Sequence, residues 1–196
     1  YKEQYTVMTH NINRLIRLLQ QILEFRKAET GNLKLKVSQG DLVQFVRRSL
    51  DSFRPLMKKK DIHFTIQNDS ERYLAFFDSD KLDKILYNLF SNASKYNKPG
   101  GKVAIELSHD STNGLACLVV KDNGPGIPAE CREHVFEMFY SGKNKVSDSR
   151  RSLGLGLALC RSIVNAHGGE IALYDCDPQG CCFWFNLPLS EVNLNE

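Results

Sequence analysis

Nine residues near the middle of the chain, Asn88 to Tyr96, constrain its fold and chemistry more than any other stretch. On a helix, Asn88, Asn92 and Lys95 project from one face, because they lie at i, i+4 and i+7. The opposite face carries an apolar set that predicts packing on a core: Leu86, Leu89, Phe90 and Ala93. Carboxamide oxygens are hard, uncharged Mg²⁺ ligands, and a lysine one turn on can neutralise a phosphate. Taken alone, the stretch is equally consistent with an ordinary amphipathic helix whose asparagines face water.

Two glycine-rich turns follow this helix, about 30 residues apart. The first, Asp122 to Ile127, comes directly after a strand-like apolar run, and the second, Gly154 to Gly156, opens an apolar helix. Glycine allows a backbone to approach a ligand closely, and the N–H groups at the start of a helix bind anions. One such turn is weak evidence, but two of them downstream of the asparagine and lysine helix predict a nucleotide site.

This order of motifs resembles the catalytic, ATP-binding domain of sensor histidine kinases, within the Bergerat-fold (GHKL) group of ATPases and kinases. The resemblance spans residues 32–190 through four boxes: the N box (88–96), the first glycine box (122–127), the F box (136–139) and the second glycine box (154–156). It implies an α/β fold, a two-layer α/β sandwich in which helices cover one face of a mixed sheet. It also implies ATP and Mg²⁺ as ligands.

Asp122 is the residue that the resemblance assigns to the adenine base. A carboxylate accepts a hydrogen bond from the exocyclic amino group of adenine and repels the carbonyl of guanine, although an Asp-Asn-Gly sequence also forms turns without any ligand. The full predicted ATP-binding set is Asn88, Asn92, Lys95, Tyr96, Asp122, Gly124, Gly126, Ile127, Lys143, Arg150, Arg151, Gly154, Leu155, Gly156 and Leu157. Asn92 and Asn88 are also the predicted magnesium ligands.

The polar segment between Phe139 and Gly154 has no hydrophobic period, and we interpret it as the lid over ATP. Its basic residues, Lys143, Lys145, Arg150 and Arg151, are candidates to contact the triphosphate, with solvated surface charge as the alternative for each. Phe136 and Phe139 are expected to anchor the base of this lid by packing.

The residue type at position 88 distinguishes kinases from hydrolases within this fold group. Gyrase-like, mismatch-repair and heat-shock members of the fold group carry a glutamate at the position of Asn88, and that glutamate activates a water. The resemblance therefore implies a kinase that keeps the γ-phosphate for a histidine acceptor, and it implies no catalytic residue in this chain beyond those that position ATP.

Residues 4–28 are predicted to form one helix with a heptad seam, Met8, Ile12, Leu15, Leu19 and Ile22. Ile16 and Leu23 widen the stripe, which favours a four-helix bundle with partner helices over a helix folded onto its own domain. This part resembles the second helix of the dimerisation hairpin. The histidine box of the first helix is absent, because no glutamate or proline follows His10. The predicted domains are 1–30 (hairpin helix), 31–190 (ATP-binding domain) and 191–196 (tail).

Composition narrows the class of protein. The chain has 196 residues, 25% of them charged, and a net charge of +3, a balance that argues against a dedicated nucleic-acid binder. No apolar run reaches membrane-spanning length, and the first residue is Tyr1, so we expect a fragment of a longer protein. Six cysteines without a C-x-x-C pair fit reduced thiols in a cytosolic protein.

The resemblance further implies a homodimer formed through the hairpin, a response regulator receiver domain as partner, and a membrane-anchored bacterial parent with this portion in the cytoplasm. Two alternatives remain open at this point. One is a non-catalytic module that senses nucleotide and signals by ATP-dependent docking, and the other is a coiled-coil dimeriser that carries the remaining residues as a passenger.

The remaining pattern predicts the elements around the motifs. We expect an edge strand over 33–37, a helix capped by Asp41 and ending near Met57, and an N-box helix that Asp80 precedes and that stops at 99–101. Further strands are expected over 62–66, 73–77, 102–108, 115–121, 171–174 and 182–187, with a helix over 153–167.

Overall fold

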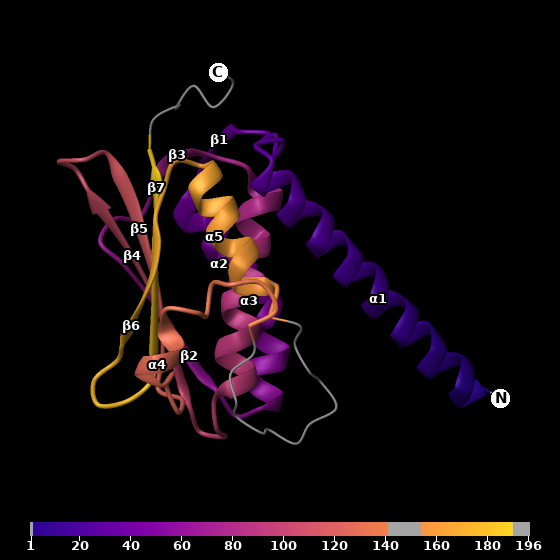
Figure 1. Cartoon of the computed structure of the whole chain (residues 1–196). Helices are drawn as coiled ribbons and strands as arrows, with labels where there is room; N and C mark the ends of the chain where they lie inside the picture. The colour runs from indigo at the N-terminus through magenta and orange to yellow at the C-terminus, as the bar shows by residue number, and fades with distance from the viewer. Residues whose placement is uncertain (1, 141–153, 190–196) are drawn as a thin grey trace.

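A mixed sheet carries the domain, and the computed structural model describes residues 2–140 and 154–189 of the chain. Within these residues the helices are α1 (Lys2–Glu29), α2 (Leu42–Lys59), α3 (Ser79–Tyr96), α4 (Ala129–Arg132) and α5 (Gly156–Ala166). The strands are β1 (Ser38–Asp41), β2 (His63–Asn68), β3 (Leu74–Phe77), β4 (Lys102–Asp110), β5 (Leu115–Asp122), β6 (Ile171–Asp175) and β7 (Cys181–Pro188). Five strands form the main sheet in the order β2-β4-β5-β7-β6, and α2, α3 and α5 cover one face (Figure 1). The predicted two-layer α/β fold is confirmed.

The register of the central strands sets where Asp122 lies. β4 and β5 form an antiparallel hairpin that pairs Val103 with Asp122, and β5 pairs antiparallel with β7, so that Asp122 also lies opposite Cys181. Val120, two residues before Asp122, is buried beneath the helices. Because side chains alternate along a strand, Asp122 points to the helix-covered face as well.

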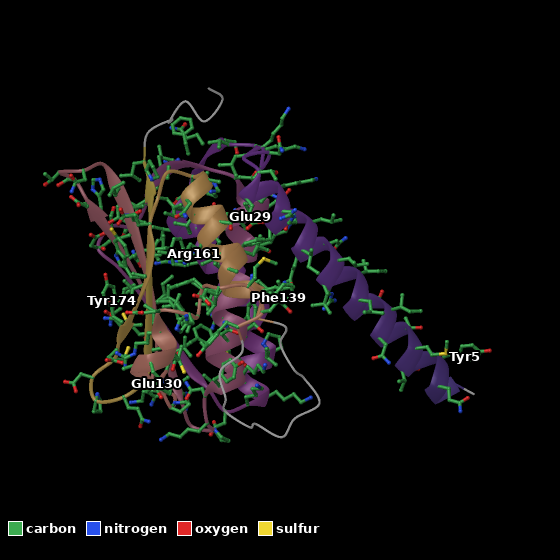
Figure 2. The ribbon with its side chains drawn as sticks, in the orientation of Figure 1. Tyr5, Glu29, Glu130, Phe139, Arg161 and Tyr174 are labelled. Carbon is green, nitrogen blue, oxygen red and sulfur yellow. The ribbon has the colours of Figure 1, made fainter. Side chains whose placement is uncertain are left out.

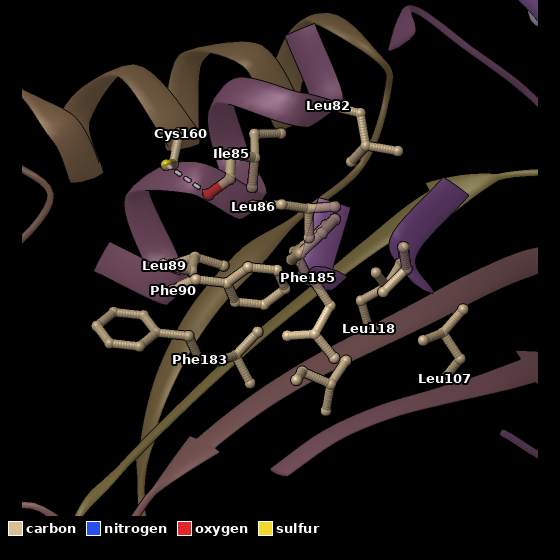
Figure 3. Packing of buried hydrophobic residues seen from close by; sticks show 14 of the residues in the cluster. Leu82, Ile85, Leu86, Leu89, Phe90, Leu107, Leu118, Cys160, Phe183 and Phe185 are labelled. Atoms are coloured by element: carbon tan, nitrogen blue, oxygen red, sulfur yellow. Dashed lines mark hydrogen bonds between the residues drawn. The ribbon is translucent and has the colours of Figure 1, made fainter. Parts of the chain in front are cut away.

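The core fills the space between α3, α5 and the sheet. Leu86, Leu89 and Phe90 of α3 face Phe183 and Phe185 of β7, as Figure 3 shows. Phe90 and Phe185 are both fully buried. The apolar face predicted for the N-box helix is therefore confirmed, because its residues form the centre of the core.

One predicted element at the edge of the domain was wrong, and another was right but lies in an unexpected sheet. Residues 33–37 are not a strand: the backbone N–H of Lys36 donates to the Asp78 carboxylate at 2.7 Å, and strand pairing begins at Ser38, opposite Phe77. The predicted strand over 73–77 exists as β3, but it pairs antiparallel with β1 in a separate two-stranded sheet. Hydrophobic alternation marked extended chain in both places but did not identify the pairing partner.

The start of α3 also differs from its prediction. The helix begins at Ser79, with Asp78 as the N-cap, so Asp80 lies within the first turn instead of preceding the helix. Asp78 accepts from the N–H of Lys81 at 3.1 Å, which satisfies one of the unpaired donors at the helix start. Its own N–H donates to His167 Nε2 at 3.1 Å, and this bond ties the start of α3 to the end of α5. The predicted Asp41 cap of α2 is confirmed.

α1 leaves the domain and extends away from the two layers, with Tyr5 near its far end (Figures 1 and 2). Its heptad stripe is exposed along most of its length; the Leu19 side chain, for example, is 60% exposed. Near its C-terminal end, the Glu24 carboxylate accepts hydrogen bonds from Lys81 and Lys84 of α3. The predicted single helix is confirmed, and most of its stripe is not folded onto the domain. Within residues 2–140 and 154–189, no helix is long and apolar enough to cross a membrane.

Candidate nucleotide site

The polar edge of α3 carries the two asparagines of the N box. Asn88 and Asn92 are both half-buried, at the border between the core face of the helix and solvent. The amide of Asn88 donates to the carbonyl of Lys84 at 3.0 Å, and its Oδ1 faces the start of α5. A Cβ atom placed on Gly156 would lie 2.7 Å from that oxygen. The second glycine turn therefore approaches the N box so closely that a side chain at position 156 would displace Asn88.

Lys95 and Tyr96 form a local pair at the end of α3. The Lys95 ammonium lies 4.8 Å from the centre of the Tyr96 ring and 3.2 Å from its hydroxyl oxygen. This is a cation–π contact between neighbouring residues at the last turn of the helix. The helical face predicted for Asn88, Asn92 and Lys95 thus divides into a carboxamide part and an ammonium–aromatic part.

Asp122 lies beside this end of α3, in the first glycine turn. Its Oδ1 accepts from the N–H of Gly124 at 2.9 Å. Burial raises the pKa of the Asp122 carboxyl above its ordinary value, while hydrogen bonds from the backbone N–H groups of Gly124 and Cys181 act in the opposite direction. A half-buried carboxylate of this kind is suited to accept a hydrogen bond from a bound amino group.

Gly124 joins the first glycine turn to α3. Its position is buried, and a Cβ there would lie 2.8 Å from Asp122 Oδ1 and 3.5 Å from the carbonyl oxygen of Tyr96. Gly126 and Ile127 follow in the same turn, and Ile127 packs against the core. Gly124 and Tyr96, 28 positions apart in the sequence, are thereby brought into contact.

The second glycine turn closes against the F box. Gly154 has a φ of 66°, and the N–H of Phe139 donates to its carbonyl at 3.1 Å. A Cβ on Gly154 would overlap the carbonyl oxygen of Tyr140, so this approach requires glycine. Leu155 is buried and Leu157 packs against the core. These two contacts fix the start of α5. The predicted lid residues Lys143, Lys145, Arg150 and Arg151 lie outside the described residues.

The two phenylalanines of the F box do not share one role. Phe136 is buried, and its ring meets Phe183 edge-on with centroids 6.4 Å apart. Phe139 is 60% exposed, with a positive φ of 62°, so the predicted packing role is wrong for this residue. Figure 2 shows Phe139 beside the helices, on their side away from the sheet. The backbone conformation required by the contact with Gly154 directs its side chain outward.

Sequence reasoning missed the polar residues that hold the first glycine turn in place. Asn123 Oδ1 accepts from the N–H of Lys102 at 2.6 Å and from the amide of Asn97 at 3.3 Å. The Asn97 amide also donates to the carbonyl of Lys102 at 3.2 Å. These bonds connect the end of α3, the start of β4 and the turn. Asn123 sits in a turn-forming Asp-Asn-Gly sequence, but no pattern names its two partners.

The two glycine turns thus flank one helix at separate points. The first contacts Tyr96 and the second contacts Asn88, eight residues earlier, which corresponds to about 12 Å along an α-helix. A carboxylate lies at the first point and the partially positive start of α5 at the second. Among the described residues, no cluster of three or more histidines, cysteines or carboxylates could hold a metal ion. The arrangement suits a long ligand with an amino-bearing base at one end and an anion at the other.

Comparison with known families agrees with this geometry. Residues 77–191 match the model of the family described as histidine kinase-, DNA gyrase B-, and HSP90-like ATPase. The sensor histidine kinase WalK of Bacillus subtilis is 32% identical over 195 residues, which are 98% of this chain and 32% of WalK. The chain spans between 13% and 19% of the length of three further histidine kinases that it matches.

Solved structures give the same assignment. Full-length histidine kinase ShkA, in complex with AMPPNP, superimposes with a TM-score of 0.84 at 25% identity, over 97% of this chain and 39% of that one. Histidine kinase ThkA, in complex with the response regulator protein TrrA, superimposes with a TM-score of 0.75 at 25% identity, over 94% of this chain and 50% of that one. The chain belongs to the histidine kinase-, DNA gyrase B- and HSP90-like ATPase family, as a catalytic ATP-binding domain of the sensor histidine kinase type.

Proposed function

We propose that this domain binds Mg²⁺·ATP along α3 and transfers the γ-phosphate to a histidine on a helix outside this chain, in two-component signalling. The observation that carries the proposal is the pair of close approaches to one helix, Gly124 at Tyr96 and Gly156 at Asn88. The purine would lie against Asp122, and the phosphates between Asn92, Asn88 and the N–H groups at the start of α5.

The residues present fit both ligands. Positions 124 and 156 are cradles that a Cβ would fill, and Asn88 offers a neutral oxygen on the side of α5. Asn92, one turn further along, would provide the second carboxamide oxygen for Mg²⁺. When bound, the metal would offset the charge of the phosphates, which is most of what phosphoryl transfer requires.

The chain's own groups would bind and orient rather than react. Asp122 would accept a hydrogen bond from the amino group of adenine, and Tyr96 and Ile127 would border the base. Asn88 cannot act as a general base toward water, because a carboxamide has no basic lone pair at neutral pH, so hydrolysis is disfavoured. Lys95, Gly126, Leu155 and Leu157 complete the described part of the proposed site, and Lys143, Arg150 and Arg151 are its proposed cations from the lid segment.

The wider assembly is also a proposal. The exposed stripe of α1 supports its role as the second helix of a dimerisation hairpin, within a homodimer whose missing helix carries the phosphoacceptor histidine. The ThkA complex supports a response regulator receiver domain as the downstream partner. We place the domain in the cytoplasm, where ATP is supplied, as part of a membrane-anchored parent.

Replacing Asp122 by asparagine tests the base contact. Hydrogen bonds to charged groups are worth about 1.5–3 kcal/mol, so Asp122→Asn should weaken ATP binding about 10- to 150-fold, measured by titration calorimetry. Asp110→Asn is the matched control, because Asp110 is the last residue of β4 and lies at the end of the β4–β5 hairpin opposite to Asp122. An Asp122→Asn domain that holds ATP as well as the wild type would overturn the assignment.

A second experiment tests the metal and the reaction. Asn92→Ala should abolish the part of ATP affinity that depends on Mg²⁺ while leaving the metal-free affinity unchanged. Adding a chain that bears the missing hairpin helix with its histidine box should then yield acid-labile phosphate on that histidine. Intact ATP binding without any such phosphate would instead identify the module as a nucleotide sensor that signals by docking.

A further inference from the structure

The first glycine turn is also held from the side away from α3. We call residues 122–128 the purine loop; they face the connection between β6 and β7, residues 175–180. The side-chain amide of Gln179 donates to the carbonyl of Pro125 at 3.0 Å, and Nε of Arg132 donates to the carbonyl of Ile127 at 3.0 Å. Two side chains from outside the loop therefore bind two of its carbonyl groups.

Arg132 connects this loop to the end of β6. While Nε binds Ile127, the Nη2 atom of Arg132 lies 2.5 Å from Oδ1 of Asp175, the last residue of β6. The Arg132 side chain is 33% exposed and that of Asp175 is 61% exposed. The ion pair is therefore well solvated and contributes little stability by itself, and its effect is to orient the guanidinium. The planar fork of arginine can serve two acceptors in this way, which a lysine ammonium cannot do in the same geometry.

An open pocket borders the loop on this side. A cavity of about 520 Å³ lies between residues 125–128 and residues 175–180, with Arg132 at its wall. The loop approaches this connection closely at Gly180, whose Cβ would overlap the carbonyl oxygen of Asp122. Along residues 125–128 the pocket leaves room for the backbone to shift when its hydrogen bonds are removed.

We propose that Arg132 is a positioning residue for the purine contact, acting on Asp122 through the Ile127 carbonyl and itself oriented by Asp175. Arg132 fixes the C-terminal end of the purine loop, and the close contacts of Gly124 and Gly180 fix its N-terminal end. The Asp122 carboxylate therefore keeps one orientation toward the base. This inference rests on the proposed ATP site.

The experiment compares ATP with purine riboside triphosphate, which lacks the exocyclic amino group and so cannot use Asp122 as an acceptor. A carboxylate that loses its orientation should keep part of this hydrogen bond, so we expect about a three- to tenfold change, less than the 10- to 150-fold change for complete loss. Arg132→Ala should weaken the binding of ATP by about that factor and the binding of purine riboside triphosphate much less. The preference of the domain for ATP over the analogue should therefore fall. Asp175→Asn should give a smaller change of the same kind, about twofold. In an Asp122→Asn background, Arg132→Ala should have no further effect on the preference.

Two variants keep the outcome interpretable. Arg132→Lys retains the charge but not the fork, and it should resemble Arg132→Ala in preference even if Arg132→Ala itself folds poorly. Arg54→Ala is the matched control, because Arg54 is an exposed, ion-paired arginine on α2. Equal weakening of both nucleotides by Arg132→Ala, or full rescue by Arg132→Lys, would overturn the proposal. A wild-type domain without any preference for ATP would instead contradict the ATP site.

Discussion

α1 and α3 are both long amphipathic helices, yet their apolar stripes have opposite surroundings. Phe90 in the stripe of α3 is fully buried, whereas Leu19 in the stripe of α1 is 60% exposed. α3 lies against the main sheet, and α1 leaves the domain after its C-terminal end (Figure 1). An apolar stripe thus indicates that one face of a helix packs against another surface. It does not indicate whether that surface lies in the same molecule or in a partner.

The two stripes should therefore differ in what they contribute to the stability of this chain. The stripe of α3 contributes through close packing with β5 and β7, which is lost as soon as a side chain is shortened. The stripe of α1 contributes little along its exposed length, and near its end the Glu24 carboxylate contacts Lys81 and Lys84 of α3. Mutations at three sites separate these contributions.

The largest effect is expected in α3. Phe90→Ala should lower the free energy of unfolding by about 3–5 kcal/mol, because it removes a fully buried ring and leaves a cavity. Urea denaturation monitored by circular dichroism measures this change. Tyr87→Ala, in the same helix but 53% exposed, is the control and should lose no more than the roughly 0.5–1.5 kcal/mol of its ring contact with Phe53. Similar losses for the two variants would contradict the assignment of the core.

An intermediate effect is expected where α1 meets α3. Glu24→Gln should lower the free energy of unfolding by about 1 kcal/mol at pH 7, since it removes the charge that binds two lysines. Burial raises the pKa of the Glu24 carboxyl, but the hydrogen bonds and charges of Lys81 and Lys84 outweigh it and place the pKa below 4.5.

The same group predicts a pH dependence. With a lower pKa in the folded state than in the unfolded state, Glu24 contributes its full stability above pH 4.5 and loses it as the pH falls through the folded pKa. The difference between wild type and Glu24→Gln should therefore shrink in denaturation curves recorded at progressively lower pH. Glu29→Gln, an exposed partner of Arg26 on the same helix, should show neither effect. A constant difference across this range would show that the charge is not involved.

The smallest effect is expected in the free part of α1. Leu19→Ala should change the free energy of unfolding by no more than about 0.5 kcal/mol, because the side chain contributes little buried area and alanine is a good helix former. Thermal denaturation of the isolated domain measures it. In a chain that also contains the proposed partner helix, the same change should cost about 2–5 kcal/mol. A large loss in the isolated domain would mean that the stripe of α1 is already covered.

Local sequence determined the helices and the chemistry of the site. The 3.6-residue period located α1, α2 and α3, since helical hydrogen bonds and amphipathic spacing are local, and Asp41 marked the start of α2 in the same way. The two glycine turns were predictable because they combine glycine with residue types suited to a nucleotide. The family comparison supports that function, and the individual contacts to ATP remain predictions.

Tertiary structure decided everything that depends on a distant partner. Lys36 donates to Asp78 rather than to a neighbouring strand, and β3 pairs with β1 outside the main sheet, because hydrogen-bond partners are selected by where the chain returns. Phe139 points outward while Phe136 is buried, although both lie in the same short motif. Arg132, Gln179 and Gly180 meet the purine loop across residues distant in sequence, and such contacts leave no periodic signal. Spacing along a chain encodes which face of an element is apolar, but it does not encode what that face or loop will touch.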